Sequence, residues 1–354
     1  ADAIDRTRSA WHAAAGFGAS SEILMADYDV LCIGNAIVDI IAQCDDAFLE
    51  TNGIVKGAMN LIDARRAELL YSRMGPAVEA SGGSAGNTAA GIASFGGRAA
   101  YFGKVSKDHL GGIFTHDIHA QGVAFDTKPL QGTPPTARSM IFVTPDGERS
   151  MNTYLGACVE LGPDDVEADK AKGASVTYFE GYLWDPPKAK EAIRQTARLA
   201  HEAGREVAMT LSDSFCVDRY RDEFLDLMRS GTVDIVFANS QEIRSLYQTE
   251  SFDGAVELIR KDCRLAAVTR SEEGSVIVRG NETVTIKAAP IRELVDTTGA
   301  GDLYAAGFLH GYTQGRDMKA CGDLGSLAAG LVIQQIGPRP RQNLRQEAKA
   351  AGLL

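Results

Sequence analysis

The sequence predicts an α/β protein with a doubly wound, mostly parallel sheet flanked by helices. Short apolar segments of strand length recur along the chain, and stretches with helical spacing lie between them. Strands that alternate with helices in this way favour a parallel sheet covered on both faces. The sequence of residues 26–354 contains no internal repeat, charge block or low-complexity linker, so we expect a single domain there.

The expected elements follow one another along the chain. An apolar tetrapeptide at 30–33 is the first strand, and weak alternation through 40–62, interrupted by Gly53 and Gly57, favours short strands over a long helix. Further strands are expected at 176–183, 207–211, 235–238 and 267–269, with an extended run that ends at 293–295; helices are expected at 64–74, 88–95, 188–203, 222–228, 303–309 and 324–336, and a frayed tail at 342–354.

A β-hairpin is predicted around the sequence Pro-Asp-Gly-Glu at 145–148. Two short segments of strand length, 139–143 and 149–153, flank this sequence. Proline and glycine at these turn positions favour a tight reversal of the chain. The two segments should therefore pair as antiparallel strands.

Composition narrows the classes of partner. The formal net charge of −11 argues against a nucleic-acid binder, because such proteins present a basic face. No apolar run approaches the ~20 residues that span a bilayer. We therefore expect small-molecule partners and no membrane. Residues 1–25 are small and polar without a convincing signal-peptide core, so we expect them to be a leader or extension with no catalytic role.

The cysteines indicate a reducing compartment. None of the six has C-x-x-C spacing or paired histidines nearby. This pattern is typical of reduced, buried thiols rather than of a disulfide framework or a zinc site. We expect a cytoplasmic protein, and the six residues are Cys32, Cys44, Cys158, Cys216, Cys263 and Cys321.

The heptad Asp-Thr-Thr-Gly-Ala-Gly-Asp at 296–302 is the strongest functional signal. It lies between an expected extended run and an expected helix, where glycines permit a sharp turn and leave backbone N–H groups free. Free N–H groups at a helix N-terminus favour an anion. A carboxylate beside such a site repels the anion, so Asp302 is a candidate base that takes a proton from an attacking hydroxyl. A short G-x-G-D string alone is more often a structural turn.

The complete heptad resembles the C-terminal signature of the ribokinase (PfkB) family of carbohydrate and nucleoside kinases. The resemblance covers nearly all of residues 27–340 and implies the ribokinase-like fold with a small β-sheet lid, formed here by segments near 38–62 and 122–155. It implies that Asp302 is the catalytic base and that the backbone of Gly299, Ala300 and Gly301 is the anion hole. Arg149, just after the predicted hairpin turn, would point from the lid at the transferring phosphate.

Two segments resemble the family's substrate motifs. Gly-Asn-Ala-Ile-Val-Asp-Ile at 34–40 implies that Asp39 accepts hydrogen bonds from two vicinal sugar hydroxyls, although a turn or cap role is as common for such a residue. Ser-Gly-Gly-Ser-Ala-Gly-Asn at 81–87 implies sugar contacts by Gly82, Gly83 and Asn87. The alternatives for this second segment are a flexible linker or a dinucleotide loop, but it lacks G-x-G-x-x-G spacing.

Two further segments resemble the nucleotide motifs. Asn239 and Glu242 form an N-x-x-E pattern, which implies Mg²⁺ bound through water near the ATP phosphates, whereas a bare pattern of this kind is usually a helix cap. Thr269, Ser271 and Gly274 lie in a segment that resembles the ATP loop. ATP and Mg²⁺ are the expected cofactors, a monovalent cation is a further candidate, and the protein is expected to be a monomer or a homodimer.

Within the family, the chain resembles bacterial adenosine-kinase-type members most. This implies ATP-dependent phosphorylation of the 5′-hydroxyl of adenosine to give AMP and ADP. The substrate motifs bring no basic residue that would hold a substrate phosphate, which favours an uncharged ribose-like substrate. The chain has Tyr182-Leu183-Trp184 where eukaryotic adenosine kinases have paired Phe residues, and Thr298 where their heptad has Asn.

Three alternatives stay open on the sequence. One is a ribokinase or another kinase of this family, acting on inosine and guanosine or on fructose. A second is a non-catalytic nucleotide- or sugar-binding sensor, which the complete set of Asp302, Arg149, Asn239 and Glu242 disfavours. A third is a nicotinamide dehydrogenase, which the missing dinucleotide fingerprint disfavours.

Overall fold

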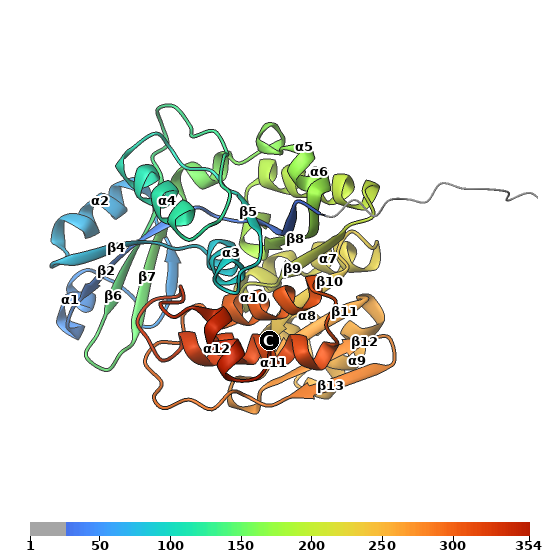
Figure 1. Ribbon diagram of the computed structural model, residues 1–354. Helices are drawn as coiled ribbons and strands as arrows, with labels where there is room; N and C mark the ends of the chain where they lie inside the picture. The colour runs from blue at the N-terminus through green and yellow to red at the C-terminus, as the bar shows by residue number, and fades with distance from the viewer. Residues whose placement is uncertain (1–25) are drawn as a thin grey trace, which may run out of the picture.

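The structure is a computed structural model that describes residues 26–354 (Figure 1). The extension expected at residues 1–25 lies outside the described residues. Two β-sheets organise the chain, and the larger has eight strands in the order β13-β12-β11-β10-β9-β8-β1-β5. Its strands are β1 Tyr28–Ile33, β5 Ala99–Phe102, β8 Ala174–Glu180, β9 Glu206–Thr210, β10 Ile235–Asn239, β11 Leu265–Thr269, β12 Ser275–Arg279 and β13 Glu282–Ile286.

The large sheet is parallel from β5 to β11, and at one edge β12 pairs antiparallel with both β11 and β13. Its central strands are mostly apolar because both faces are covered. In β1, Val30 and Cys32 pack into the core on one face, and Leu31 and Ile33 pack into the core on the other. This arrangement confirms the predicted doubly wound, mostly parallel sheet.

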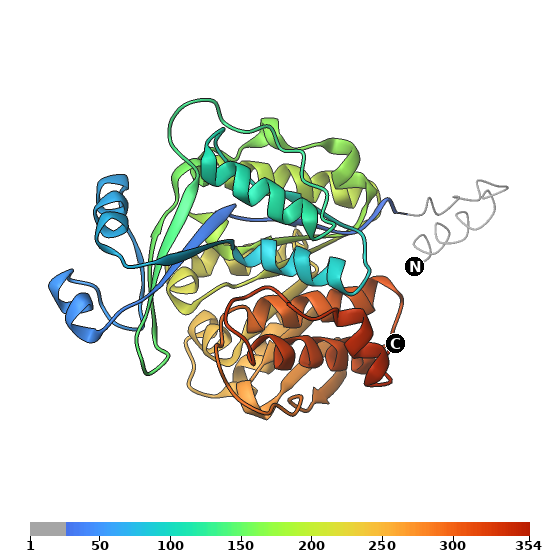
Figure 2. The ribbon, with the colours of Figure 1, turned by 60° about the vertical axis from the view of Figure 1, so that its left-hand side comes forward.

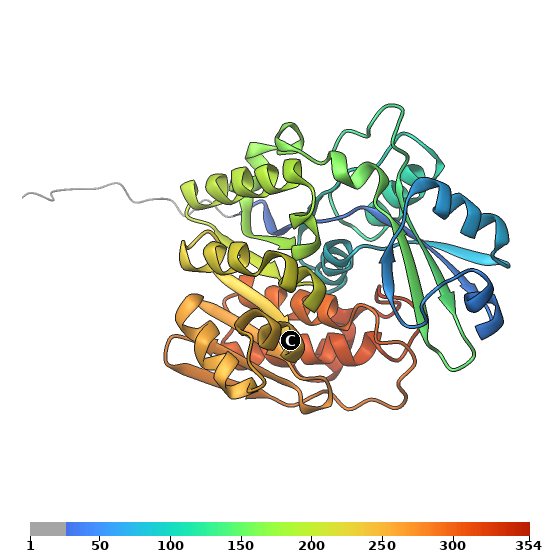
Figure 3. The same cartoon turned by 180° about the vertical axis from the view of Figure 1, so that it is seen from behind.

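Helices form a layer on each face of the large sheet. One layer contains α3 Ser84–Ser94, α10 Ala300–Thr313 and α11 Met318–Val332, which lie on the near side in Figure 1. The opposite layer is seen from behind in Figure 3 and contains α5 Ala168–Gly173, α6 Pro187–Glu202, α7 Ser214–Arg229, α8 Ser240–Tyr247 and α9 Phe252–Asp262. Helix α4 His109–Ala120 packs beside α3 and the smaller sheet.

The smaller sheet projects from one side of the molecule, as Figure 2 shows. Its strand order is β3-β7-β6-β2-β4. The predicted hairpin is confirmed: β6 and β7 pair antiparallel across a turn in which Gly147 has a φ of 83° and donates to Thr144 at 2.8 Å. The strands are β2 Ile37–Gln43, β3 Met59–Leu61, β4 Ala77–Ser81, β6 Ala137–Val143 and β7 Arg149–Tyr154, and helices α1 Asp46–Thr51 and α2 Ala64–Arg73 pack against this sheet.

Several expected boundaries were wrong. The stretch at 40–62 contains α1 as well as strands, and the strand expected at 176–183 ends at Glu180, where a 3₁₀ turn begins. The helix expected at 324–336 begins six residues earlier, at Met318, and ends at Val332. The extended run expected at 293–295 is not a strand, because the N–H of Val295 donates to Ile333 at the end of α11.

The C-terminal tail is also more ordered than expected. Residues 342–354 contain the helix α12 Leu344–Ala350, which is capped by Asn343. Leu344 and Ala348 lie four residues apart and are fully buried against the core. Two apolar anchors in a polar stretch are too weak a pattern to predict a helix, but their burial stabilises one. Across residues 26–354, no helix combines the length and apolar character that crossing a bilayer requires.

Candidate active site

A cavity of about 930 Å³ lies between the carboxyl ends of the large sheet's strands and the smaller sheet. Ligands of open α/β sheets collect at this edge. The cavity is lined by all of the expected site residues except Gly82 and Arg149: Asp39, Gly83, Asn87, Asn239, Glu242, Thr269, Ser271, Gly274, Gly299, Ala300, Gly301 and Asp302. Residues far apart in the sequence therefore share one cavity.

The N-terminus of α10 forms a wall of the cavity with free backbone donors. Gly299 precedes the helix in the left-handed conformation, with a φ of 81°, and no side chain caps this end. None of the described residues accepts a hydrogen bond from the N–H of Gly301 or Asp302. An ideal Cβ on Gly301 would meet nothing within 4 Å, so an anion can approach these donors closely.

The turn before α10 is held by Asp296. Its Oδ1 accepts from the N–H of Thr298 at 3.0 Å, and its Oδ2 accepts from the N–H of Gly337 at 2.9 Å. The expectation that a strand leads into this helix was wrong. A loop follows β13, and contacts with the C-terminal segment fix its end.

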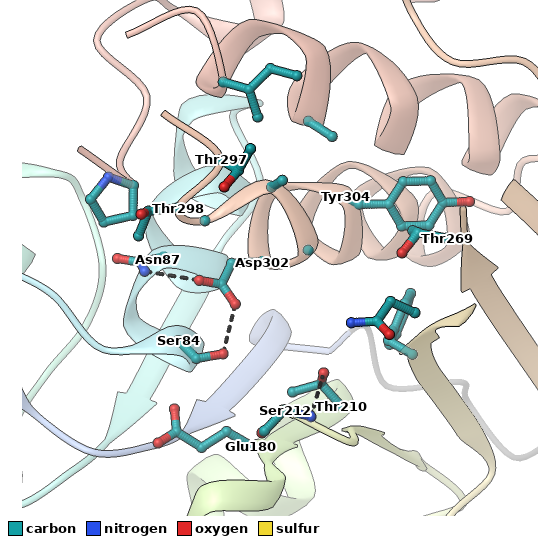
Figure 4. Close-up of a pocket in the computed structure, with 18 of the residues that line it drawn as sticks. Ser84, Asn87, Glu180, Thr210, Ser212, Thr269, Thr297, Thr298, Asp302 and Tyr304 are labelled. Atoms are coloured by element: carbon teal, nitrogen blue, oxygen red, sulfur yellow. Dashed lines mark hydrogen bonds between the residues drawn. The ribbon is translucent and has the colours of Figure 1, made fainter. Parts of the chain in front are cut away.

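Asp302 lies in the first turn of α10 and faces residues of the second substrate motif. Ser84 Oγ donates to Oδ1 at 2.6 Å and Asn87 Nδ2 donates to Oδ2 at 2.9 Å (Figure 4). Burial raises the pKa of Asp302, and the two hydrogen bonds oppose that shift. A carboxylate held beside free N–H groups can accept a proton from a hydroxyl bound in the cavity.

Asp39 lies on β2 and is 9% exposed. Burial raises its pKa to about 6, and the positive charges of Arg149 and Arg339 oppose the shift. Gly82 contacts this carboxylate from behind rather than lining the cavity: an ideal Cβ on Gly82 would lie 2.5 Å from Asp39 Oδ2. The absence of a side chain at Gly82 thus leaves room for Asp39.

Arg149 reaches from β7 of the smaller sheet to the heptad. Its Nη1 donates to Asp296 Oδ2 and to Thr298 Oγ1, both at 2.7 Å. Its Nη2 is buried and has no hydrogen-bond partner among the described residues. Arg149 therefore lies behind the cavity wall and ties the smaller sheet to the anion-binding turn.

Asn239 and Glu242 form a helix cap as well as part of the cavity wall. The Asn239 side chain accepts from the N–H of Glu242, and the Glu242 carboxylate accepts from the Asn239 N–H at 2.9 Å and from its side-chain amide at 2.5 Å. Burial raises the pKa of Glu242 to about 7. No group of three or more His, Cys, Asp or Glu side chains in residues 26–354 is arranged to hold a metal ion. Each carboxylate oxygen accepts one hydrogen bond within the cap and keeps a lone pair that a metal-bound water can use.

The segment after β11 supplies the remaining expected contacts. Thr269 ends the strand, and Ser271 follows with a φ of 51°, which is unusual for a residue with a side chain. Gly274 has a φ of 88°, and an ideal Cβ there would collide with the Ile286 carbonyl at 1.9 Å. The close approach of β13 therefore requires glycine at this position.

Comparison with known proteins identifies the family to which this chain belongs. Residues 29–343 match the model of the pfkB family of carbohydrate kinases. The chain belongs to the PfkB family of carbohydrate kinases. This match confirms three expectations from the sequence: the resemblance to this family, the ribokinase-like fold and the phosphotransferase class.

Individual relatives are similar over most of their length. The adenosine kinase of Sinorhizobium meliloti is 74% identical, covers 92% of this chain and 100% of that protein, and superposes with a TM-score of 0.88. A probable sugar kinase from Rhizobium etli CFN 42 is 71% identical, with 93% and 100% coverage and a TM-score of 0.90. The adenosine kinase of Saccharomyces cerevisiae is 27% identical over 87% of this chain and 96% of that protein.

Glu180 is a buried residue of this PfkB kinase site that the sequence interpretation missed. It ends β8, and its carboxylate accepts from the Asn35 N–H at 2.9 Å, from the Asn35 side-chain amide at 2.7 Å and from the Ala85 N–H at 2.8 Å. Burial raises the pKa of Glu180 to about 7. A charged residue at the end of an apolar strand was a signal that could have indicated it.

Asn35 and Tyr182 are further cavity residues that the sequence alone did not assign. Asn35 lines the cavity. Its Oδ1 is buried and has no hydrogen-bond partner among the described residues. Of the three residues that replace the paired Phe, Tyr182 lines the cavity, whereas Leu183 and Trp184 are fully buried in the core. The one ring that this segment offers to a ligand is therefore that of Tyr182.

Proposed function

We propose that this kinase transfers the γ-phosphoryl group of ATP to the 5′-hydroxyl of adenosine, giving AMP and ADP. The observation that carries the proposal is the cavity shared by Asp302, the free N–H groups of α10 and Asp39. One carboxylate adjoins the anion site, and the other is available to a diol. The adenosine kinase of Sinorhizobium meliloti, at 74% identity, supports adenosine as the substrate.

The cavity wall suits an uncharged nucleoside. Its lid side is apolar, with Met59, Leu61 and Met151 available to cover a purine ring, and Tyr182 can stack on the base. The cationic side chain of Arg219 also lines the cavity, but it is paired with Asp185 at 2.9 Å. Among the described residues that line the cavity, no cationic side chain is therefore left unpaired for a phosphorylated substrate.

The chain's own residues account for the transfer step. Asp39 would accept hydrogen bonds from the ribose diol, with Gly83 beside it, and Asp302 would take the proton of the 5′-hydroxyl. A bond forms between the 5′-oxygen and the γ-phosphorus as the bond to the ADP oxygen breaks. The N–H groups of Gly299, Gly301 and Asp302 would stabilise the negative charge on the transferring group. The Ala300 N–H, which was also expected in the anion hole, instead donates to the Thr297 carbonyl at 3.2 Å.

The nucleotide side is assigned to the opposite part of the cavity. We place ATP against Thr269, Ser271, Gly274 and Asn239, with Mg²⁺ near Asn239 and Glu242 through water. When bound, Mg²⁺ neutralises phosphate charge. We also place the enzyme in the cytoplasm, because its six cysteines are unpaired, and we propose that it works as a monomer or a homodimer.

A substrate panel tests the proposal. ADP formation is measured with adenosine, inosine, ribose and fructose, and the nucleotide product is identified by chromatography. Adenosine should give the highest kcat/KM and yield AMP. A preference for ribose or fructose would identify a sugar kinase instead, and binding without ADP formation would identify a sensor.

The deoxy analogue tests the diol contact. Since Asp39 would lose a hydrogen-bond donor, 2′-deoxyadenosine should react with a kcat/KM lower by at least ~10²-fold. Equal kcat/KM values for the two nucleosides would show that Asp39 does not bind the diol.

A further inference from the structure

Arg339 occupies the space behind the substrate motif, on the segment that follows α11. Its guanidinium donates from Nε to Asn87 Oδ1 at 3.3 Å and from Nη2 to the Gly82 carbonyl at 3.2 Å, and Nη1 donates to Ser81 Oγ. Gln335 Nε2 donates to the Arg339 carbonyl at 2.6 Å and fixes the backbone there. One side chain near the C-terminus thus holds three residues of the 81–87 segment.

Arg339 and Asp302 together fix the orientation of the Asn87 carboxamide. The amide lies between a guanidinium, which can only donate, and the Asp302 carboxylate, which accepts when ionised. One orientation satisfies both neighbours: Oδ1 toward Arg339 and Nδ2 toward Asp302. Without the guanidinium only the Asp302 carboxylate would orient the amide, so Asn87 would hold that carboxylate less firmly.

The same guanidinium also supports the diol side of the cavity. Gly82, whose carbonyl it holds, packs directly against the Asp39 carboxylate. Gly86 leaves the room that the guanidinium needs, because an ideal Cβ there would lie 3.2 Å from Arg339 Nη2. Arg339 lines neither the substrate side nor the nucleotide side of the cavity, so its contribution passes through its neighbours.

We propose that Arg339 is a positioning residue for phosphoryl transfer: it fixes the Asn87 amide, so that Asn87 holds Asp302 in the orientation that receives the substrate proton. The proposal rests on the proposed role of Asp302 as the base. It assigns a function to the Gly337–Pro340 segment, whose sequence predicts only a helix end. The role connects Arg339, near the end of the domain, with the 81–87 segment near its beginning.

The first test replaces the guanidinium. Arg339→Met should lower kcat by ~10–100-fold, because a displacement of the base of about 1 Å has an effect of this size, while KM for ATP changes by less than about threefold. Arg339→Lys should recover part of kcat, since an ammonium keeps the positive charge and can still donate, although it lacks the planar fork of the guanidinium. Arg341→Gln, an exposed arginine two residues further on, is the matched control and should have wild-type kcat. A wild-type kcat for Arg339→Met would overturn the proposal.

A double-mutant cycle separates positioning from general destabilisation. If Arg339 acts through Asn87, adding Arg339→Met to the Asn87→Ala variant should lower kcat by less than about threefold relative to Asn87→Ala alone. The full additional loss in that background would overturn the proposal. Should Arg339→Met fail to fold, Arg339→Lys takes its place in the cycle, with the same two outcomes.

The choice of assay substrate separates the proposal that adenosine is the substrate from the proposal that Arg339 is a positioning residue. Turnover is measured on whichever substrate the panel selects. Failure of the wild-type enzyme with adenosine would therefore reject the proposed substrate, whereas wild-type turnover by the Arg339 variants would reject the positioning role.

Discussion

At the scale of single residues, the state of Asp302 decides whether the site can accept a proton. Its two oxygens each accept a hydrogen bond, from Ser84 and from Asn87, which favours the ionised form that burial opposes. Ser84 and Asn87 belong to the motif that the resemblance assigned to sugar contacts. In the structure their side chains hold the carboxylate as well, so the substrate motif and the catalytic motif form one unit.

Replacing Asp302 with Asn should lower kcat by ~10²–10⁴-fold with little change in KM for ATP, because an amide cannot take the hydroxyl proton. Steady-state kinetics with the selected substrate measures the effect. Asp253→Asn is the matched control, since Asp253 is an exposed aspartate in the first turn of α9. Near-normal turnover by Asp302→Asn would remove Asp302 from the proposed role.

Gly82 offers a second test at this scale. In Gly82→Ala, the new methyl group would lie 2.5 Å from Asp39 Oδ2, so the carboxylate must move. We expect kcat/KM for the nucleoside to fall by ~10–100-fold while KM for ATP is preserved. Gly112→Ala on α4 is the control, because nothing lies within 4 Å of that position. Unchanged kcat/KM in Gly82→Ala would mean that Asp39 tolerates displacement or does not contact the substrate.

At the scale of elements, Arg149 couples the smaller sheet to the turn that opens α10. It bonds Asp296 and Thr298 and keeps one buried donor, Nη2, without a partner in residues 26–354. A phosphate near the turn could use this donor. Arg149→Gln should therefore lower kcat by ~10–10³-fold, since the charge and the coupling are both lost.

The control for this variant is Arg138→Gln on the neighbouring strand β6. The Arg138 guanidinium lies 3.9 Å from the exposed Glu68, and Arg138 pairs with Tyr154 at the end of β7 opposite Arg149. Its kcat should stay within about threefold of wild type. Equal losses in the two variants would show that the effect comes from the lid's stability rather than from the contact between Arg149 and Asp296.

Local patterns could predict most elements, because the central strands and the amphipathic helices carry their signals in consecutive residues. The hairpin of β6 and β7 was predicted from the glycine in its turn, and in the structure Gly147 adopts the positive φ that such a turn requires. The helix α12 was missed because its stability depends on burying Leu344 and Ala348 against distant residues. The loop before α10 was misassigned as extended because its backbone bonds the end of α11 instead of a strand.

The site could be predicted only where residues form a motif. Gly299 to Asp302 and Asp39 lie in recognisable strings, and the cavity unites them. Arg339 contacts a residue 252 positions away, so no local spacing indicates it. Glu180 contacts a residue 95 positions away, and its one local signal is a charge at the end of an apolar strand. The contacts of Arg149 could not be predicted. The sequence led us to expect it near the phosphate, but which atoms it contacts depends on how the smaller sheet packs against the heptad.

At the scale of the whole molecule, the site depends on several buried carboxylic acids. Burial raises the pKa of Glu180 and of Glu242 to about 7, and that of Asp39 to about 6. Between their unfolded and folded pKa values, the folded state binds more protons than the unfolded state. The contribution of the two glutamates to the free energy of unfolding is therefore complete below about pH 4.5 and is lost as pH rises through about 7. The contribution of Asp39 is complete below about pH 3.8 and is lost as pH rises through about 6.

Glu180→Gln should weaken this pH dependence. The variant cannot ionise at residue 180, so its Tm should fall less than that of the wild type between pH 5 and pH 8. Its Tm at pH 5 should be lower than the wild-type value, because the amide cannot satisfy the N–H groups of both Asn35 and Ala85. Burial lowers the pKa of His310, which acts in the opposite direction, but this contribution is common to both proteins and cancels in the comparison.

The measurement is Tm by differential scanning calorimetry from pH 5 to pH 8, with Glu202→Gln as the control. Glu202 is an exposed residue at the end of α6, so its replacement should leave the pH dependence of Tm unchanged. Parallel curves for the wild type and Glu180→Gln would mean that Glu180 is ionised throughout this range in the folded protein. In that case the three hydrogen bonds that its carboxylate accepts stabilise the charge more than burial opposes it.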